Sequence, residues 1–264
     1  MAWLYFIINL GLLILAVFSG KYIYKHFKKY WIPVAVFSLL FLFLEAFLIQ
    51  RPDIEYMLIP WIDYAFFRGW GLLGAFVVFG IGIEQLPKSN QRALIIFTVF
   101  LIIIRMYMWW SILFGLDYNF KEKGFKNGIC FQSTQYTCAP SSCATLLKHY
   151  GIESTEKEMA RLCLTGNVRA TSNIKTVRGL RLIVNEKGYD VKIKLTDMEG
   201  LKKIPKPCLI SVKVTFMVNH MVVLSSLTDD KAIILDPEDG KFDLKKSEFE
   251  KEWVGNAIWL VSNK

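Results

Sequence analysis

The sequence predicts two parts of different class: a membrane bundle of about four helices, followed by an α+β domain with an antiparallel sheet. The first observation is the distribution of charge, because only nine of the 32 Lys and Arg residues lie before residue 118. The second is a change of hydrophobic period, from helical spacing after residue 137 to short β-branched runs after residue 188. The predicted boundaries are 1–117 for the membrane part, 118–128 for a polar linker and 129–264 for the α+β domain.

The membrane part contains apolar stretches that are each long enough to cross a bilayer, which takes about 20 helical residues. These stretches are 2–20, 31–50, 66–86 and 93–115. The segment 57–65 is too polar to cross by itself, and we expect it to extend the third helix or to lie in the membrane interface. Trp residues near the ends of the stretches suit the headgroup layer.

Two charged residues fall inside these stretches, Glu45 in the second and Arg105 in the fourth. A charge is costly at that depth and usually faces a partner. We interpret the two residues as an ion pair that joins the helices, and a transport or proton pathway is the alternative.

The loops indicate an orientation, because basic loops stay on the cytoplasmic side of a membrane. Four Lys residues lie between residues 21 and 29, which places the first loop in the cytoplasm and the amino terminus outside. The loop near Arg51 suits the outer face, and the weakly basic loop near Lys88 suits the inner face. With four spans, the chain after Phe114 emerges on the non-cytoplasmic side, and one missed or surplus span would reverse this prediction.

The composition excludes several classes of protein. With 53% hydrophobic residues, the chain is not a disordered protein. The net charge of +9 comes without a basic stripe interleaved with aromatic residues, so we expect no nucleic-acid partner. The five Cys residues form no CxxC pair, and we expect neither a metal site nor a cofactor.

Start and stop signals define three helices in the second half. The first covers 138–150, and a capping box of Thr155 and Glu158 begins the second, which runs to about residue 162. The third covers 173–187 and stops at Gly188. Strands are then predicted at 189–195, 208–214, 220–227, 231–236 and 257–262, with a hairpin turn at 228–231.

Cys138 opens the first of these helices, where the positive end of the helix dipole favours a thiolate, the nucleophilic form of cysteine. A cysteine nucleophile needs a base, usually His, and the chain has three His residues. His26 lies in the basic loop, and His149 is on the same helix as Cys138, about 16 Å away. His220, at the start of a strand, is the residue that remains.

The base needs an acceptor that fixes its tautomer, and Asp236 ends the strand that pairs with the strand of His220. In a hairpin centred near 229–230, Asp236 faces about Val223 and lies close to His220 along the sheet. The other interpretation of Asp236 is a turn-starter before Pro237.

Acyl transfer also needs donors for the developing oxyanion. The backbone N–H of Cys138 is one such donor. The side-chain amides of Gln132 and Gln135 both qualify by type as the second, and Gln132 lies six residues before the cysteine.

The order of Gln132, Cys138, His220 and Asp236 resembles that of papain-like cysteine peptidases. More specifically, the segments QSTQYTCAPSSCATLLKHYGI, NHMVVL and LDPEDG resemble the bacteriocin-processing peptidase family, whose members cut leader peptides after a double glycine. The resemblance covers about residues 127–262 and implies a papain-like fold. It implies that Cys138 is the nucleophile and that His220 is the general base and then the acid. Asp236 would orient His220, and Gln132 would help to form the oxyanion hole.

Two positions depart from the family pattern. Thr137 stands where an acidic residue is usual before the cysteine, and Ala139 stands where Gly is usual after it, which bears on substrate preference. In many relatives the peptidase is fused to an ABC exporter and faces the cytoplasm, whereas the charge rule places it outside here. The sequence has no GxxxxGKS/T phosphate loop, so we expect no ATP hydrolysis by this chain.

The sequence therefore predicts a membrane-anchored cysteine peptidase of a bacterial-type cell membrane, which cleaves peptide or leader segments through an acyl-enzyme. Its expected partners are a peptide or protein substrate, the lipid bilayer and a separate transporter. Two alternatives stay open. One is a peptidase fold that binds a peptide or partner without cleaving it, and the other is a transport subunit built around Glu45 and Arg105.

Overall fold

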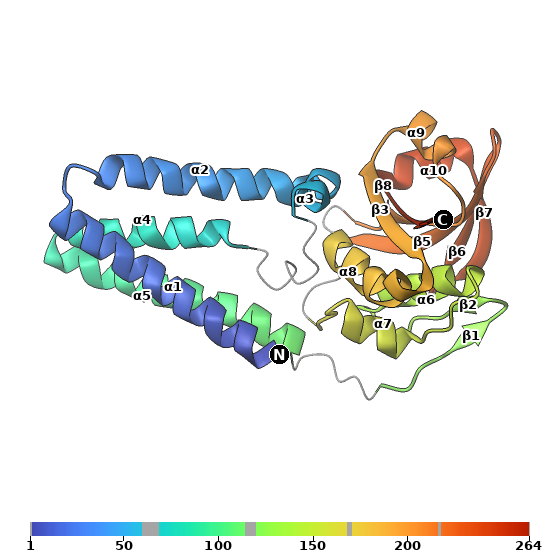
Figure 1. Cartoon of the computed structure of the whole chain (residues 1–264), viewed down its shortest axis with the longest axis horizontal. Coiled ribbons are helices and arrows are strands. Elements are labelled where there is room, and N and C mark those ends of the chain that lie inside the picture. Colours follow the sequence, from blue (N-terminus) through green and yellow to red (C-terminus); the bar gives the residue numbers. More distant parts are fainter. Residues whose placement is uncertain (1, 60–68, 114–119, 168–170, 216–217, 264) are drawn as a thin grey trace. The chain divides into compact units, whose positions relative to one another are not determined.

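The computed structural model describes residues 2–59, 69–113, 120–167, 171–215 and 218–263 (Figure 1). The chain divides into two compact units. A helical unit comprises Met1–Glu55 and Asp63–Leu113, and an α+β unit comprises Tyr56–Ile62 and Phe114–Lys264.

The elements that the structure describes in the first part of the chain are all helices. Its helices are α1 (Ala2–His26), α2 (Trp31–Gln50), α3 (Pro52–Leu58), α4 (Gly71–Gln85) and α5 (Lys88–Leu113). Among the described residues, three segments are long and apolar enough to cross a membrane: Leu4–His26, Trp31–Gln50 and Lys88–Met108. The third predicted span corresponds to α4, an apolar helix of 15 residues. The start of that span, the end of the fourth span and most of 57–65 lie outside the described residues.

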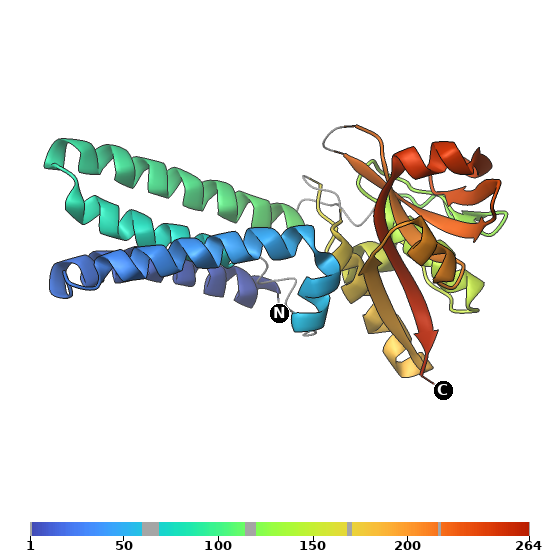
Figure 2. The same ribbon diagram turned by 90° about the horizontal axis from the view of Figure 1, so that it is seen from above.

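The helical unit is packed around α4, which contacts α1, α2 and α5. A side chain at Gly80 would overlap the carbonyl group of Val17 in α1, and one at Gly74 would overlap the backbone of Ser38 in α2. Small residues at these crossings allow the close backbone approach that is typical of membrane helices. The α1–α2 and α4–α5 connections lie at the same end of the unit (Figure 2), where Lys21 pairs with Glu84 at 3.3 Å.

The side chain of Glu45 contacts the start of α4. Its carboxylate accepts hydrogen bonds from the backbone N–H groups of Gly69 and of Gly71, the latter at 2.5 Å. The guanidinium of Arg105 reaches the same turn, because a side chain at Gly69 would overlap it. An ion pair between Glu45 and Arg105 stays a prediction.

The second unit contains the antiparallel sheet that the sequence predicts. Six strands pair in the order β3-β8-β4-β5-β6-β7, all antiparallel. They are β3 (Tyr189–Leu195), β4 (Cys208–Lys213), β5 (Asn219–Leu227), β6 (Lys231–Asp236), β7 (Gly240–Lys245) and β8 (Trp253–Ser262). A second, two-stranded sheet joins β1 (Phe125–Lys126), which falls within the predicted linker, to β2 (Ile129–Cys130). The domain boundaries stay a prediction.

The three predicted helices of this unit are α6 (Cys138–His149), α7 (Glu156–Leu162) and α8 (Asn173–Val184). The hydroxyl of Thr155 accepts from the N–H of Glu158 at 3.1 Å, which is half of the predicted capping box. A single 3₁₀ turn extends α8 to residue 187, and the chain then turns at Gly188 with φ of 78°. The short helices α9 (Met198–Lys203) and α10 (Lys246–Glu252) were not predicted.

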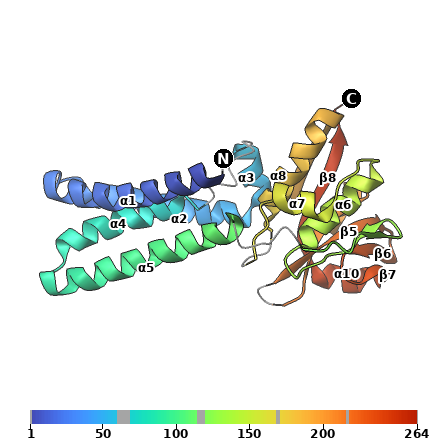
Figure 3. The same ribbon diagram turned by 90° about the horizontal axis from the view of Figure 1, so that it is seen from below.

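The two faces of the sheet carry separate hydrophobic cores, as strand periodicity requires. Leu209 and Val223 face the core formed with α6, α7 and α8, whereas their neighbours Ile210 and Val222 face the core formed with α9 and α10. Figure 3 shows α6, α7 and α8 together beside the sheet, with α10 apart from them. The sheet therefore fixes α6 on one face, where α6 contacts β4 and β5.

Candidate active site

Cys138 is the first residue of α6, as the sequence predicts. The helix is buried over most of its length, and a tight turn before it positions the cysteine. Within that turn the hydroxyl of Thr137 donates to the carbonyl of Thr134 at 2.9 Å, and Thr137 is itself fully buried. Thr137 thus has a structural role at the position where the family pattern has an acidic residue.

A hydrogen bond from Ser142 attaches the first turns of α6 to the sheet. The hydroxyl of Ser142, one helical turn after Cys138, donates to the backbone carbonyl of Met221 at 2.8 Å. Met221 follows His220 in β5. This contact therefore sets the approach of the cysteine to the histidine.

His220 and Asp236 meet across the β5–β6 ladder. Val223 pairs with Leu235, so Asp236 lies diagonally opposite His220, within reach of a side-chain contact. Nε2 of His220 donates to Oδ1 of Asp236 at 3.0 Å. The sequence places Asp236 opposite Val223, and the structure differs by one residue because a bulge shifts the register between Leu224 and Ser226.

The electrostatics of this pair favour its charged forms. Burial lowers the pKa of His220, but the hydrogen bond with Asp236 and the neighbouring Cys138 outweigh burial and raise that pKa to about 10. Burial opposes the charge of Asp236 as well, yet the contact with His220 and the N–H groups of Glu238 and Asp239 lower the pKa of its carboxyl. Because Nε2 faces Asp236, Nδ1 of His220 is left for the thiol.

Gln132 is held from the turn that follows Asp236. Its backbone N–H donates to the carbonyl of Pro237 at 2.8 Å, and its Nε2 donates to Oε2 of Glu238 at 3.3 Å. The side chain is 7% exposed, and its Oε1 has no hydrogen-bond partner among the described residues. The amide that was predicted from the sequence is therefore present at the site.

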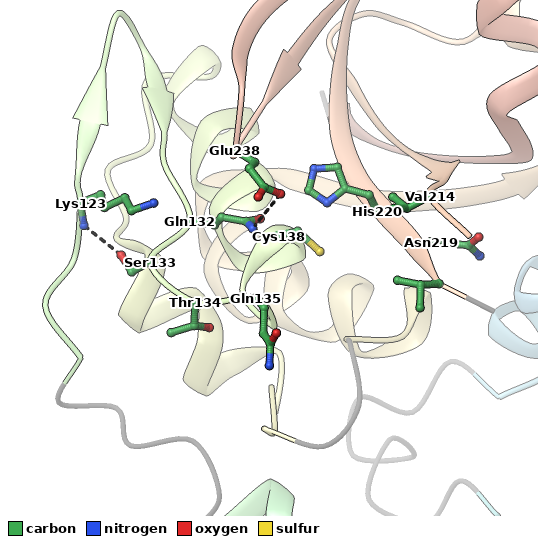
Figure 4. A pocket seen from close by; sticks show the side chains of 11 residues that line it. Lys123, Gln132, Ser133, Thr134, Gln135, Cys138, Val214, Asn219, His220 and Glu238 are labelled. Carbon is green, nitrogen blue, oxygen red and sulfur yellow. Dashed lines mark hydrogen bonds between the residues drawn. The ribbon is translucent and has the colours of Figure 1, made fainter. Parts of the chain in front are cut away.

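These side chains open into one pocket of about 320 Å³ (Figure 4). Its lining includes Gln132, Cys138 and His220 together with Glu238, and Asp236 stands behind His220. Gln135, the other amide considered from the sequence, lines the same pocket but is exposed. The structure thus brings all four predicted site residues together.

The remaining cysteines do not share this environment. Cys130, Cys143, Cys163 and Cys208 are buried, and none of the five cysteines of the chain is in a disulfide. Burial raises the pKa of the Cys130 and Cys208 thiols to about 12. Within the described ranges, no three His, Cys, Asp or Glu side chains are grouped so that they could hold a metal ion.

Comparison with known families decides the identity of this unit. Residues 126–264, just over half of the chain, match the Peptidase C39 family. The chain belongs to the Peptidase C39 family of cysteine peptidases. The resemblance seen in the sequence is thereby confirmed, and the C39 match covers the whole six-stranded sheet and the helices α6 to α10.

Two curated proteins are similar to this C39 chain. An uncharacterized protein of Methanothermobacter thermautotrophicus is 29% identical over 133 residues, which are 49% of this chain and 85% of that protein. The lactococcin-G-processing and transport ATP-binding protein LagD of Lactococcus lactis is 31% identical over 133 residues, which are 50% of this chain but only 18% of LagD.

Two solved structures are similar to part of this chain. The peptidase domain of Streptococcus ComA, a bifunctional ABC transporter involved in quorum sensing, has 23% identity and a TM-score of 0.45, over 51% of this chain and 97% of that domain. A double glycine motif protease from an AMS/PCAT transporter, in complex with the leader peptide, has 22% identity and a TM-score of 0.43, over 51% of this chain and 90% of that protein.

Two residues at the site were missed from the sequence. Glu238 appears in the sequence analysis only within the segment LDPEDG, and Glu156 is not among its candidates. Glu238 contacts a residue 106 positions away, and Glu156 contacts Ser133, 23 positions away. The local signal for Glu238 is its position two residues after Asp236, which keeps it close to the site.

Proposed function

We propose that this C39 protein is a membrane-anchored cysteine peptidase, with Cys138 as nucleophile, His220 as general base and acid, Asp236 as orienting residue and Gln132 as oxyanion donor. The observation that carries the proposal is the hydrogen bond from His220 to Asp236, in a pocket that Cys138 and Gln132 also line. A thiol, an imidazole and an orienting carboxylate are the groups that covalent acyl transfer requires.

The acylation step follows from this arrangement. The raised pKa of His220 keeps its imidazole protonated at neutral pH, which is the form that stabilises a Cys138 thiolate. The thiolate attacks the carbonyl carbon of the peptide, and the carbonyl oxygen gains the negative charge. The N–H of Cys138 and the amide of Gln132 stabilise that oxygen. His220 then gives its proton to the leaving amine as the carbon–nitrogen bond breaks.

Deacylation uses the same groups in the reverse order. Water enters the pocket after the amine leaves, and His220 takes a proton from it as it attacks the thioester carbonyl. The carbon–sulfur bond breaks, the carboxylic acid is released, and the thiolate with its imidazolium is restored. Asp236 keeps the imidazole in one orientation through both steps, because Nε2 stays bound to it.

The substrate we propose is a peptide or leader segment that is cut after a double glycine. LagD is named as a processing and transport protein, and the AMS/PCAT protease is named for a double glycine motif. A separate transporter is the partner we propose, because LagD is named as a processing and transport ATP-binding protein.

The helical part is proposed to anchor the enzyme in a bacterial-type cell membrane with four crossings. The three long apolar helices support this, and α4 with its glycine crossings packs among them as a fourth. The two basic connections lie at one end of the unit, as crossings in alternating directions require. The charge rule then places the peptidase on the non-cytoplasmic side.

The test is cleavage profiling by mass spectrometry. Detergent-purified wild type and Cys138→Ala would be incubated with a peptide library that includes double-glycine leaders. We expect cuts by the wild type alone, and the flanking residues would give the specificity. Cuts by both proteins would contradict the role of Cys138, and peptide binding without any cut would favour the non-cleaving binding module.

A further inference from the structure

The turn after β6 contacts both halves of the proposed catalytic machinery. Oδ1 of Asp236 accepts from His220 and also from the backbone N–H of Glu238 at 2.7 Å, which fixes the course of the turn. The next two residues of the same turn hold Gln132, Pro237 through its carbonyl and Glu238 through its carboxylate. Three consecutive residues thus hold the base and the amide in one frame.

The amide of Gln132 presents a choice of orientation. Its two ends have almost the same shape, but only the nitrogen can donate to an oxyanion. In the structure Nε2 faces Oε2 of Glu238, and Oε1 is buried without a hydrogen-bond partner among the described residues. No hydrogen bond from a described residue to Oε1 therefore favours this orientation of the amide over the reversed one.

The carboxylate of Glu238 determines which end of the Gln132 amide faces it. An ionised carboxylate is an acceptor only, so it binds the nitrogen of an amide and repels the oxygen. A rotation of the Gln132 amide by half a turn would place Oε1 against Oε2 of Glu238 and lose the hydrogen bond between them. The nitrogen carries two hydrogens, so one can bind Glu238 while the other points to the substrate oxygen.

We propose that Glu238 is a positioning residue, which holds the amide of Gln132 with its nitrogen toward the pocket so that the amide can stabilise the oxyanion. The inference rests on the proposed function, because it assigns Glu238 an effect only through Gln132. Glu238 lines the pocket together with Cys138, and its carboxylate accepts a hydrogen bond from Gln132 (Figure 4).

A different role for the same carboxylate would be to bind a cationic group of the substrate. That role would appear in KM, since it acts in the ground state as well as in the transition state. Positioning of an oxyanion donor acts on the transition state, so it appears in kcat and leaves KM nearly unchanged. The two roles are therefore separable by steady-state kinetics.

The experiment uses the detergent-purified full chain and a peptide that ends in Gly-Gly joined to a fluorogenic amine. We expect Glu238→Ala to lower kcat about tenfold, a part of the loss of about 10²-fold or more that is expected for removal of the donor itself in Gln132→Ala. KM should change by less than about twofold. In the double variant Gln132→Ala/Glu238→Ala, the second substitution should cause no further loss.

The control is Asp230→Asn, which removes one negative charge from an exposed turn of the same sheet that does not line the pocket. Its kcat should equal that of the wild type. Glu238 is exposed, so its truncation should not unfold the chain, and thermal unfolding would check this. If Glu238→Ala were unfolded, Glu238→Gln would be measured in the same cycle.

The outcomes separate the inference from the function on which it rests. A wild type that does not cut the peptide would count against the proposed function. A wild type that cuts, with Glu238→Ala altering only KM or nothing, would overturn the inference alone. An equal loss of kcat with and without Gln132 would also overturn it, because Glu238 would then act independently of the amide.

Discussion

The buried carboxylate of Glu156 accepts hydrogen bonds from both the backbone N–H and the hydroxyl of Ser133, at 2.7 and 2.6 Å. Ser133 directly follows Gln132, so the first turn of α7 holds the loop that carries the proposed oxyanion donor. A carboxylate is well placed there, because the start of a helix favours negative charge. The loop is thus fixed from two sides, by Glu156 on α7 and by the turn after β6.

We predict that Glu156→Ala destabilises the chain by about 1–3 kcal/mol, because both donors of Ser133 would lose their acceptor. Thermal unfolding of the detergent-purified chain measures this. Glu158→Gln, on the exposed side of the same helix, is the control and should change stability by less than about 0.5 kcal/mol. Equal effects of the two substitutions would show that the contact with Ser133 contributes little.

The pH dependence of the reaction should follow the imidazolium of His220. Since its pKa is raised to about 10, the protonated form persists through neutral pH and is lost as the pH rises through 10. We expect Asp236→Asn to move this alkaline limit to lower pH. Burial lowers the pKa of His220, and the substitution removes the carboxylate that raises it. The dependence of kcat/KM for peptide cleavage on pH measures the limit, because the imidazolium has to protonate the leaving amine. An unchanged limit in Asp236→Asn would remove Asp236 from this role.

The hydroxyl of Ser142 offers a test of how α6 is positioned. We predict that Ser142→Ala lowers kcat/KM about tenfold, since the contact with Met221 sets the distance between Cys138 and His220. The control is Ser141→Ala, whose equally buried hydroxyl bonds to no nitrogen or oxygen of the described residues. That variant should keep full activity, and a similar loss in both would indicate a general effect of packing.

The start of α4 depends on Glu45. Glu45→Ala should destabilise the helical unit by about 1–2 kcal/mol, because the N–H groups of Gly69 and Gly71 lose a charged acceptor at a helix start. Circular dichroism during unfolding in mixed detergent micelles measures the change. Glu84→Gln, which loses only a half-exposed pair with Lys21, is the control and should be nearly neutral. A larger loss in Glu84→Gln would refute this account.

The parts of the fold that the sequence predicts are those with local signals. The capping box of Thr155 begins α7, and the β-branched runs of β5 and β6 meet at the predicted turn. The strand β7 was missed because its apolar face consists of only two half-buried residues, Phe242 and Leu244, which alternate with charged residues at the edge of the sheet. The helices α9 and α10 have six and seven residues, too few for a periodic pattern.

The proposed site divides in the same way. Cys138, His220 and Asp236 could be found by type and order, because the chemistry needs a thiol, a base and an acceptor on adjacent elements. Glu156 and Glu238 could not be found in this way, since their partners Ser133 and Gln132 are distant in the sequence. Little in the local sequence distinguishes these two Glu residues from Glu residues on the surface. The register of Asp236 was displaced by one residue because a bulge leaves no mark in the hydrophobic pattern.

Because the other four cysteines are buried, a thiol reagent added to the chain should report on Cys138 alone. Cys143, Cys163 and Cys208 are 0% exposed and Cys130 is 1% exposed, whereas Cys138 is 6% exposed and lines the pocket. An alkylating reagent should therefore mark Cys138 first, without any engineered removal of the rest. A reagent that cannot cross a bilayer would then count active enzyme in intact cells and, by reacting before or only after lysis, would tell which compartment the substrate comes from.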